Sequence, residues 1–113
     1  MEKKKEWKDF EIEVFGSVYK VHFTKDKISD STDSFYDGWH NSSTKEILVS
    51  LVNAQGEEMP DFEIQTIVLH EFVHAICCTL QFIEENNNEP MIEAIGRGFA
   101  LLLKQGLYDK IQG

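Results

Sequence analysis

The segment formed by residues 61–82 constrains the fold of this chain more than any other, because its apolar residues repeat with the period of an α-helix. Pro60 and Asp61 provide a helix start, with acidic residues in the first turn that favour the helix dipole. Spacings of three and four place the following residues on one broad face: Ile64, Ile67, Val68, Phe72, Ala75, Ile76 and Leu80. The sequence therefore predicts a long helix whose apolar face must be covered by other elements.

Two segments near the N-terminus, residues 9–15 and 18–24, alternate apolar and polar side chains with period two. This alternation is typical of strands with one buried and one exposed face. The inward positions are Phe10, Ile12 and Val14 in the first segment and Tyr19, Val21 and Phe23 in the second. Gly16 and Ser17 form a tight turn between them, so the pattern predicts an antiparallel hairpin.

The middle of the chain predicts a third strand after a long loop. Residues 25–44 are rich in Ser, Asp, Thr and Asn and show no sustained period, so we expect a loop there. Its aromatic residues, Phe35, Tyr36 and Trp39, indicate that this loop folds back on the domain. Residues 45–52 are rich in β-branched and apolar types and predict a strand.

A second helix is expected after a polar break at residues 84–88. Asn88 and Pro90 are suited to the cap and first turn of this helix, and Gly106 is suited to its end. Together these elements predict a single α+β domain over residues 1–113. In this domain a small antiparallel sheet of about three strands packs on the first helix, with the second helix alongside.

Composition limits the classes of function. With 42% hydrophobic and 27% charged residues, the chain can bury a core, and no apolar run is long enough for a membrane helix. The formal charge of −9 argues against direct nucleic-acid binding. The two cysteines, Cys77 and Cys78, are adjacent and unsuited to bridging each other, and no export signal is evident, so we expect a cytoplasmic protein. We expect a monomer or a weak oligomer.

The first helix contains the motif H-E-x-x-H, formed by His70, Glu71 and His74. Four residues make about one helical turn, so both imidazoles project from the same side at a separation suited to one tetrahedral zinc ion. Glu71 lies beside that position, where it can act as general acid and base on a water molecule. The alternative is that His70, Glu71 and His74 are ordinary helix residues that bind no metal.

A catalytic zinc needs a third protein ligand, and Glu93 near the start of the second helix is the best candidate. Gly96 and Gly98 remove side-chain bulk near Glu93, which would let the two helices approach closely. Glu89, one turn earlier, is the substitute ligand or a supporting partner. The alternative for Glu93 is a solvated surface acid.

Histidine and cysteine alternatives for the third ligand are weaker. In the longer motif H-E-x-x-H-x-x-G-x-x-H, Cys77 and Leu80 fill the positions of the Gly and the last His, so a metzincin site is excluded. Cys77 shares roughly the same helix face as the two histidines, but a helical cysteine is more often a small buried hydrophobe.

These residues resemble those of a known family. The run Leu-His-Glu-Phe-Val-His-Ala at residues 69–75, followed by Glu-Ala-Ile-Gly-Arg-Gly-Phe-Ala at residues 93–100, resembles the small ImmA/IrrE-type metallopeptidases of bacteria and their phages. The resemblance extends from about residue 12 to residue 108, although only the two helical motifs are specific. It implies a zincin-like fold, zinc bound by His70, His74 and Glu93, and Glu71 as the catalytic base. In that family the substrate is often a transcriptional repressor. For such a substrate, the predicted strand at residues 45–52 could be a free edge to which an extended segment adds through main-chain hydrogen bonds.

Zinc hydrolases usually provide a donor for the oxyanion that develops during attack. The candidates are His40, Tyr36 and Tyr108, and His40 is the first because it lies in the aromatic loop. Each of the three is also suited to an ordinary loop or packing contact.

The sequence thus supports three hypotheses. The first is a zinc metallopeptidase acting on a protein or peptide substrate, with a transcriptional repressor as the candidate. The second is a non-catalytic zinc module that binds and inhibits such a partner. The third is a helical interaction domain with no metal. Glu71 favours the first, because a structural zinc site needs no base and usually has four protein ligands.

Overall fold

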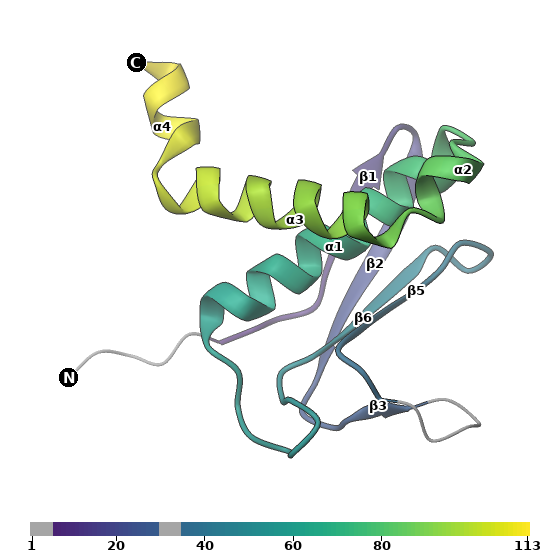
Figure 1. The fold of residues 1–113 in the computed structure, drawn as a ribbon, viewed down its shortest axis with the longest axis vertical. Coiled ribbons are helices and arrows are strands. Elements are labelled where there is room, and N and C mark those ends of the chain that lie inside the picture. Colours follow the sequence, from purple (N-terminus) through teal and green to yellow (C-terminus); the bar gives the residue numbers. More distant parts are fainter. Residues whose placement is uncertain (1–5, 30–34) are drawn as a thin grey trace.

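The main sheet has four strands in the order β1-β2-β6-β5 (Figure 1). The computed structural model describes residues 6–29 and 35–113. The strands of this sheet are β1 (Phe10–Val14), β2 (Ser17–Thr24), β6 (Glu46–Ser50) and β5 (Gly38–Asn41). A second, two-stranded sheet pairs β3 (Ile28–Ser29) with β4 (Phe35–Tyr36). With the helices packed on the main sheet, the fold is a compact α+β domain, as predicted at that level.

The predicted hairpin is confirmed, because β1 and β2 pair antiparallel with Ile12 opposite Tyr19. On β2, Tyr19 and Val21 are fully buried, as expected. The prediction that Phe10 and Ile12 of β1 are buried is wrong, because these side chains are 39% and 46% exposed. The reason is that β1 lies at the edge of the sheet, where α1 covers it only partly.

The sheet is mixed and not antiparallel, which corrects the predicted topology. β5 pairs antiparallel with β6, and β6 then lies parallel to β2. The predicted loop at residues 25–44 therefore contains strands, of which β5 belongs to the main sheet; residues 30–34 of that loop lie outside the described part. β5 has no apolar alternation, and pairing with β6 is what makes it a strand.

The third predicted strand is confirmed as β6, but it is not an edge. It lies between β2 and β5, so no substrate segment can add to it through main-chain hydrogen bonds. The edges of the main sheet are β1 and β5.

The first helix, α1 (Asp61–Thr79), packs against the sheet on one side and against α3 (Glu89–Lys104) on the other. Toward the sheet, its Ile64, Ile67 and Ala75 join the core with Tyr19 and Val49. Toward α3, a smaller cluster contains Val73, Cys77 and Ile92. The helix ends three residues before the predicted Phe82, with Gln81 in a left-handed conformation. α1 is thus the central layer of the molecule (Figure 1).

The second predicted helix is confirmed as α3. The Asn88 side chain accepts a hydrogen bond from the Met91 backbone N–H, and Gly106 after its end has a φ of 76°. The short helices α2 (Ile83–Asn86) and α4 (Leu107–Gln112) were not predicted. In the described ranges, none of the helices is long and apolar enough to cross a membrane.

Gly96 permits the close approach of α3 to α1. A Cβ atom at this position would lie 2.9 Å from both the Cα and the backbone N of His70. The same test at Gly98 finds no atom within 4 Å. The expectation that glycine removes bulk between the helices therefore holds for Gly96 and not for Gly98.

We predict that Gly96→Ala and Gly98→Ala have opposite effects on stability. The Gly96 variant forces α3 away from His70, and overpacking of this kind costs about 1–3 kcal/mol. The Gly98 variant gains about 0.5–1 kcal/mol, because alanine replaces glycine in an unobstructed helix. Urea unfolding measures both changes. Equal effects of the two variants would contradict the close packing described at Gly96.

Candidate metal centre

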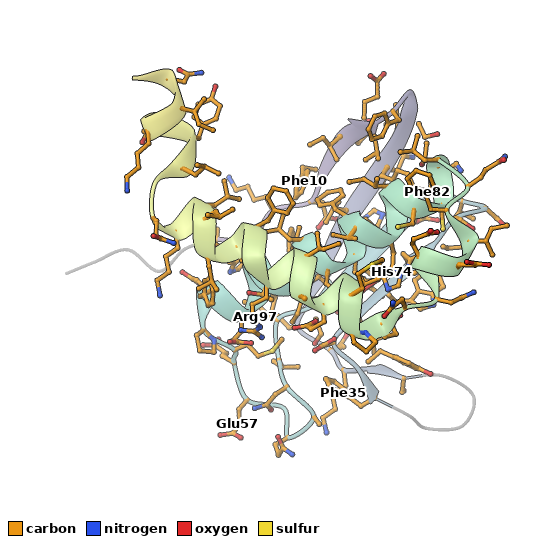
Figure 2. All side chains as sticks on the ribbon, turned by 45° about the horizontal axis from the view of Figure 1, so that its top comes forward. Phe10, Phe35, Glu57, His74, Phe82 and Arg97 are labelled. Carbon is orange, nitrogen blue, oxygen red and sulfur yellow. The ribbon has the colours of Figure 1, made fainter. Side chains whose placement is uncertain are left out.

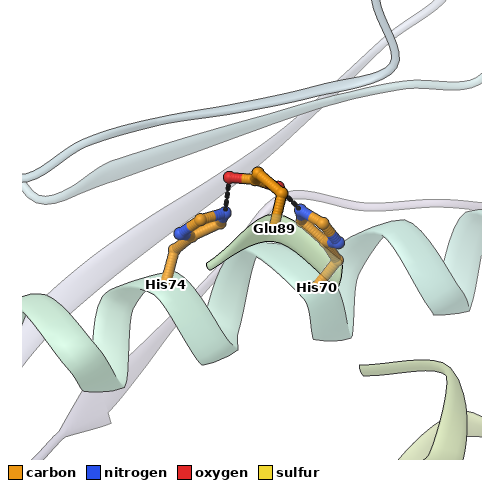
Figure 3. A group of neighbouring side chains, drawn as sticks. All are labelled: His70, His74 and Glu89. Atoms are coloured by element: carbon orange, nitrogen blue, oxygen red, sulfur yellow. Dashed lines mark ion pairs between the residues drawn. The ribbon is translucent and has the colours of Figure 1, made fainter. Parts of the chain in front are cut away.

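Three side chains from two helices converge at one point: His70, His74 and Glu89 (Figure 3). His70 Nε2 lies 3.3 Å from Glu89 Oε2, and His74 Nε2 lies 3.0 Å from Glu89 Oε1. The histidine side chains are 18% and 6% exposed, whereas that of Glu89 is 63% exposed. The group is therefore buried on the histidine side and open to solvent on the glutamate side.

The backbone explains this convergence. His70 and His74 are one turn apart on α1, so their rings project from the same side of the helix. Glu89 is the first residue of α3, directly after the Asn88 cap. Figure 2 shows His74 beside the N-terminal part of α3, with Arg97 further along that helix. The contact at Gly96 holds the two helices close enough for Glu89 to reach both rings.

The other nitrogen of each imidazole has its own partner. His70 Nδ1 lies 2.8 Å from Glu93 Oε2, and His74 Nδ1 lies 2.8 Å from Asn86 Oδ1. The Asn86 amide is oriented in turn, because its Nδ2 donates to Cys78 Sγ at 3.4 Å. Carboxylate and carbonyl oxygens only accept hydrogen bonds, so both Nδ1 atoms carry the hydrogen in these contacts.

This arrangement creates a need for a cation. With hydrogen on Nδ1, a neutral imidazole presents a bare lone pair at Nε2, and both Nε2 atoms face the acceptor oxygens of Glu89. Either added protons or one metal ion must therefore lie among them. Zinc takes imidazole nitrogen and carboxylate oxygen at about 2.0–2.1 Å, which places tetrahedral neighbours roughly 3.3 Å apart. The two nitrogen–oxygen distances are close to that value, and the ligand atoms of the three residues lie within 4.8 Å of one another, so these residues could hold a metal.

Glu93, the predicted third ligand, does not belong to this group. It contacts Nδ1 of His70, on the side of the ring away from Glu89, and also lies 3.4 Å from the Arg97 Nε atom. Its place is that of a carboxylate which could orient a histidine of a metal site, whereas Glu89, the substitute candidate, lies where a ligand could be. The two residues are one turn apart on α3, and the offset between α3 and α1 decides which one reaches Nε2.

Asn86 was missed by sequence reasoning. It falls in the predicted polar break at residues 84–88, and the short helix α2 brings it beneath His74. Its place after the H-E-x-x-H helix, together with a side chain that can accept from an imidazole, is the only signal that the sequence offered.

Glu71 is buried beside the group, with only 5% of its surface exposed. Its Oε1 accepts a hydrogen bond from His40 Nδ1 at 2.9 Å. The His40 ring also stacks on the ring of His74, with centroids 4.7 Å apart and an interplanar angle of 19°. Glu71 is thus linked to the histidine cluster through His40, which β5 supplies.

The surroundings of the group are acidic. A small pocket of about 80 Å³ beside His70 is lined by Asp37, Glu63 and Glu93, with Arg97 as the cation. Desolvation of its carboxyl raises the pKa of Asp37, and the charge of Glu71 adds to this effect, while backbone hydrogen bonds and His70 oppose it. This concentration of carboxylates attracts cations to the site.

The remaining candidates lie elsewhere or are engaged. Cys77 is buried between Val73 and Ile92, and burial raises the pKa of its thiol, so it is a packing residue and not a ligand of the group. Tyr108 lies on α4, at the far end of α3 from Glu89 (Figure 1). A helix of this length rises roughly 20 Å, which removes Tyr108 from the site. Tyr36 lies on β4 and is 40% exposed.

The chain matches no protein-family model, no curated protein and no solved structure. The resemblance to the ImmA/IrrE-type metallopeptidases therefore remains a prediction from the motif residues.

We predict that Glu89→Ala weakens zinc binding more than Glu93→Ala does. The first variant removes a ligand atom, whereas the second removes an orienting partner, which typically costs about 10–100-fold in metal affinity. Competition with a chromophoric chelator measures both dissociation constants. Glu84→Ala, which removes the same charge from exposed α2, serves as the control. A larger loss for Glu93→Ala than for Glu89→Ala would contradict the ligand assignment.

Proposed function

We propose that this protein is a zinc metallopeptidase that hydrolyses peptide bonds, with His70, His74 and Glu89 as ligands and Glu71 as general acid and base. The observation that carries the proposal is the convergence of three acceptor atoms at one point with a buried glutamate held beside them. Protonated histidines could also satisfy these contacts as ion pairs with Glu89, but ion pairs alone give no role to the buried Glu71 that His40 holds beside them.

Zinc bound there would lower the pKa of a water molecule to about 7 and polarise the carbonyl of the scissile bond. Glu71 then takes the proton of the attacking water and delivers it to the leaving nitrogen. His70 and His74 keep their rings in place through the hydrogen bonds to Glu93 and Asn86. Glu89 would neutralise part of the charge of the ion, and its side chain is 63% exposed on the open side of the group.

The number of protein ligands favours catalysis over a closed structural site. Three protein ligands leave a tetrahedral ion one position for water or substrate, whereas structural zinc is usually held by four. The second hypothesis, a non-catalytic zinc module that binds and inhibits a partner, gives no role to Glu71. Hydrolysis that depends on Glu71 therefore separates the two.

β5 is a suitable place for an extended substrate. It is an edge strand of the main sheet and carries His40, the partner of Glu71. An extended peptide can add to such an edge through main-chain hydrogen bonds. We therefore propose a protein or peptide as the substrate class, and a transcriptional repressor as the candidate that the motif resemblance suggests. We also propose the reducing cytoplasm as its location, in line with two free cysteines.

We predict that Glu71→Gln abolishes measurable hydrolysis, because loss of a general base typically costs about 10²–10⁴-fold in rate. The glutamine side chain keeps the shape of glutamate but no longer accepts the proton, so zinc affinity should stay within about threefold of the wild-type value. The assay incubates zinc-loaded protein with candidate repressors and with a peptide library, and mass spectrometry identifies new termini.

A chelator-treated sample and the Glu71→Gln protein are the controls. Cleavage that persists in both would assign the activity to a contaminant. If the zinc-loaded wild-type protein binds a repressor tightly but leaves every substrate intact, the inhibitory zinc module replaces the peptidase.

A further inference from the structure

We propose that His40 is a positioning residue for Glu71: by holding Oε1, it fixes the carboxylate of the proposed general base in one orientation beside the two histidines. The inference rests on the proposed peptidase function and adds a residue to that site. Two contacts of the Glu71 side chain carry it: the hydrogen bond to the His40 ring and the close approach of the backbone at Gly38.

Gly38 and His40 are two residues apart on β5, so they face the same side of the sheet, toward α1. A Cβ atom at Gly38 would lie 2.7 Å from Ile67 Cγ2 and 3.1 Å from both Cγ and Oε2 of Glu71. The strand backbone therefore lies directly against the Glu71 side chain. Only glycine allows this approach, and it limits the space into which the carboxylate can swing.

His40 fixes the other oxygen. Its Nδ1 donates to Glu71 Oε1 at 2.9 Å, and its ring is held by stacking on His74. A glutamate side chain has three rotatable bonds, and a general base must keep its oxygen within hydrogen-bond reach of the proton that it takes. With Oε1 bonded to His40 and Oε2 against the Gly38 backbone, the carboxylate keeps one orientation.

This geometry differs from the role predicted for His40. As an oxyanion donor, His40 would have to point a nitrogen at the developing oxyanion. Its Nδ1 is already engaged with Glu71, so only Nε2 could do so. The contact that the structure contains acts on the base, and the proposal assigns His40 to that contact.

The test compares His40→Asn with His40→Phe in the zinc-loaded protein. The Asn amide nitrogen occupies nearly the same place as Nδ1 and can donate to Glu71, whereas Phe keeps a ring on His74 but has no donor. We expect His40→Phe to lower kcat by about 10–100-fold, as loss of a supporting hydrogen bond does at a metal site. We expect His40→Asn to retain most of the wild-type kcat, and both variants to keep the KM and the zinc affinity.

His22 supplies a matched control. Like His40, it contacts acidic side chains: its Nδ1 is 3.0 Å from Asp9 Oδ2 and its Nε2 is 3.4 Å from Glu46 Oε2. His22 follows the buried Val21 on β2, so it faces the other side of the sheet, away from the core. His22→Phe and His22→Asn should leave kcat unchanged. Thermal unfolding of all four variants shows whether a change in kcat follows a change in stability.

Two results would overturn the proposal: a wild-type kcat in folded His40→Phe, or an equal loss in His40→Asn and His40→Phe. A crystal structure of zinc-loaded His40→Phe tests the inference even if no substrate is cleaved. We expect the Glu71 carboxylate to leave its wild-type position there, and an unchanged carboxylate would reject the role of His40. Absence of hydrolysis by the wild-type protein would instead reject the peptidase function.

Discussion

The site depends on the direction of two imidazole rings. Glu93 and Asn86 each accept a hydrogen bond from a Nδ1 atom, and this leaves both Nε2 lone pairs directed at Glu89. Facing acceptors in a partly buried place are unfavourable unless a cation lies among them. The rest of the fold provides the conditions for this arrangement: Gly96 brings α3 against α1, and α2 places Asn86 under His74.

The parts that the sequence predicted are those determined by local pattern. The periodicity of residues 61–82 gave α1, and the cap at Asn88 with Gly106 gave the bounds of α3. Alternation gave the β1–β2 hairpin. The pairing of His70 with His74 required only the helical repeat, because a spacing of four residues puts two side chains on one face of any helix.

The parts that it could not predict depend on contacts between distant segments. β5 has neither alternation nor β-branched residues, and it becomes a strand by pairing with β6, which also makes β6 parallel to β2. The choice between Glu89 and Glu93 depends on how far α3 is displaced along α1, a quantity that local pattern does not contain. His40 was singled out, but its partner Glu71 lies 31 residues away, and only the fold brings them together.

Anomalous diffraction at the zinc absorption edge, from crystals grown with zinc, tests the central claim most directly. The account predicts one strong peak at about 2.0–2.1 Å from Nε2 of His70, Nε2 of His74 and a carboxylate oxygen of Glu89, with one further position open to solvent. Glu93 and Asn86 should remain on the Nδ1 atoms of the two rings. A peak bound by Glu93 in place of Glu89, or no peak between the two histidines at saturating zinc, would contradict it.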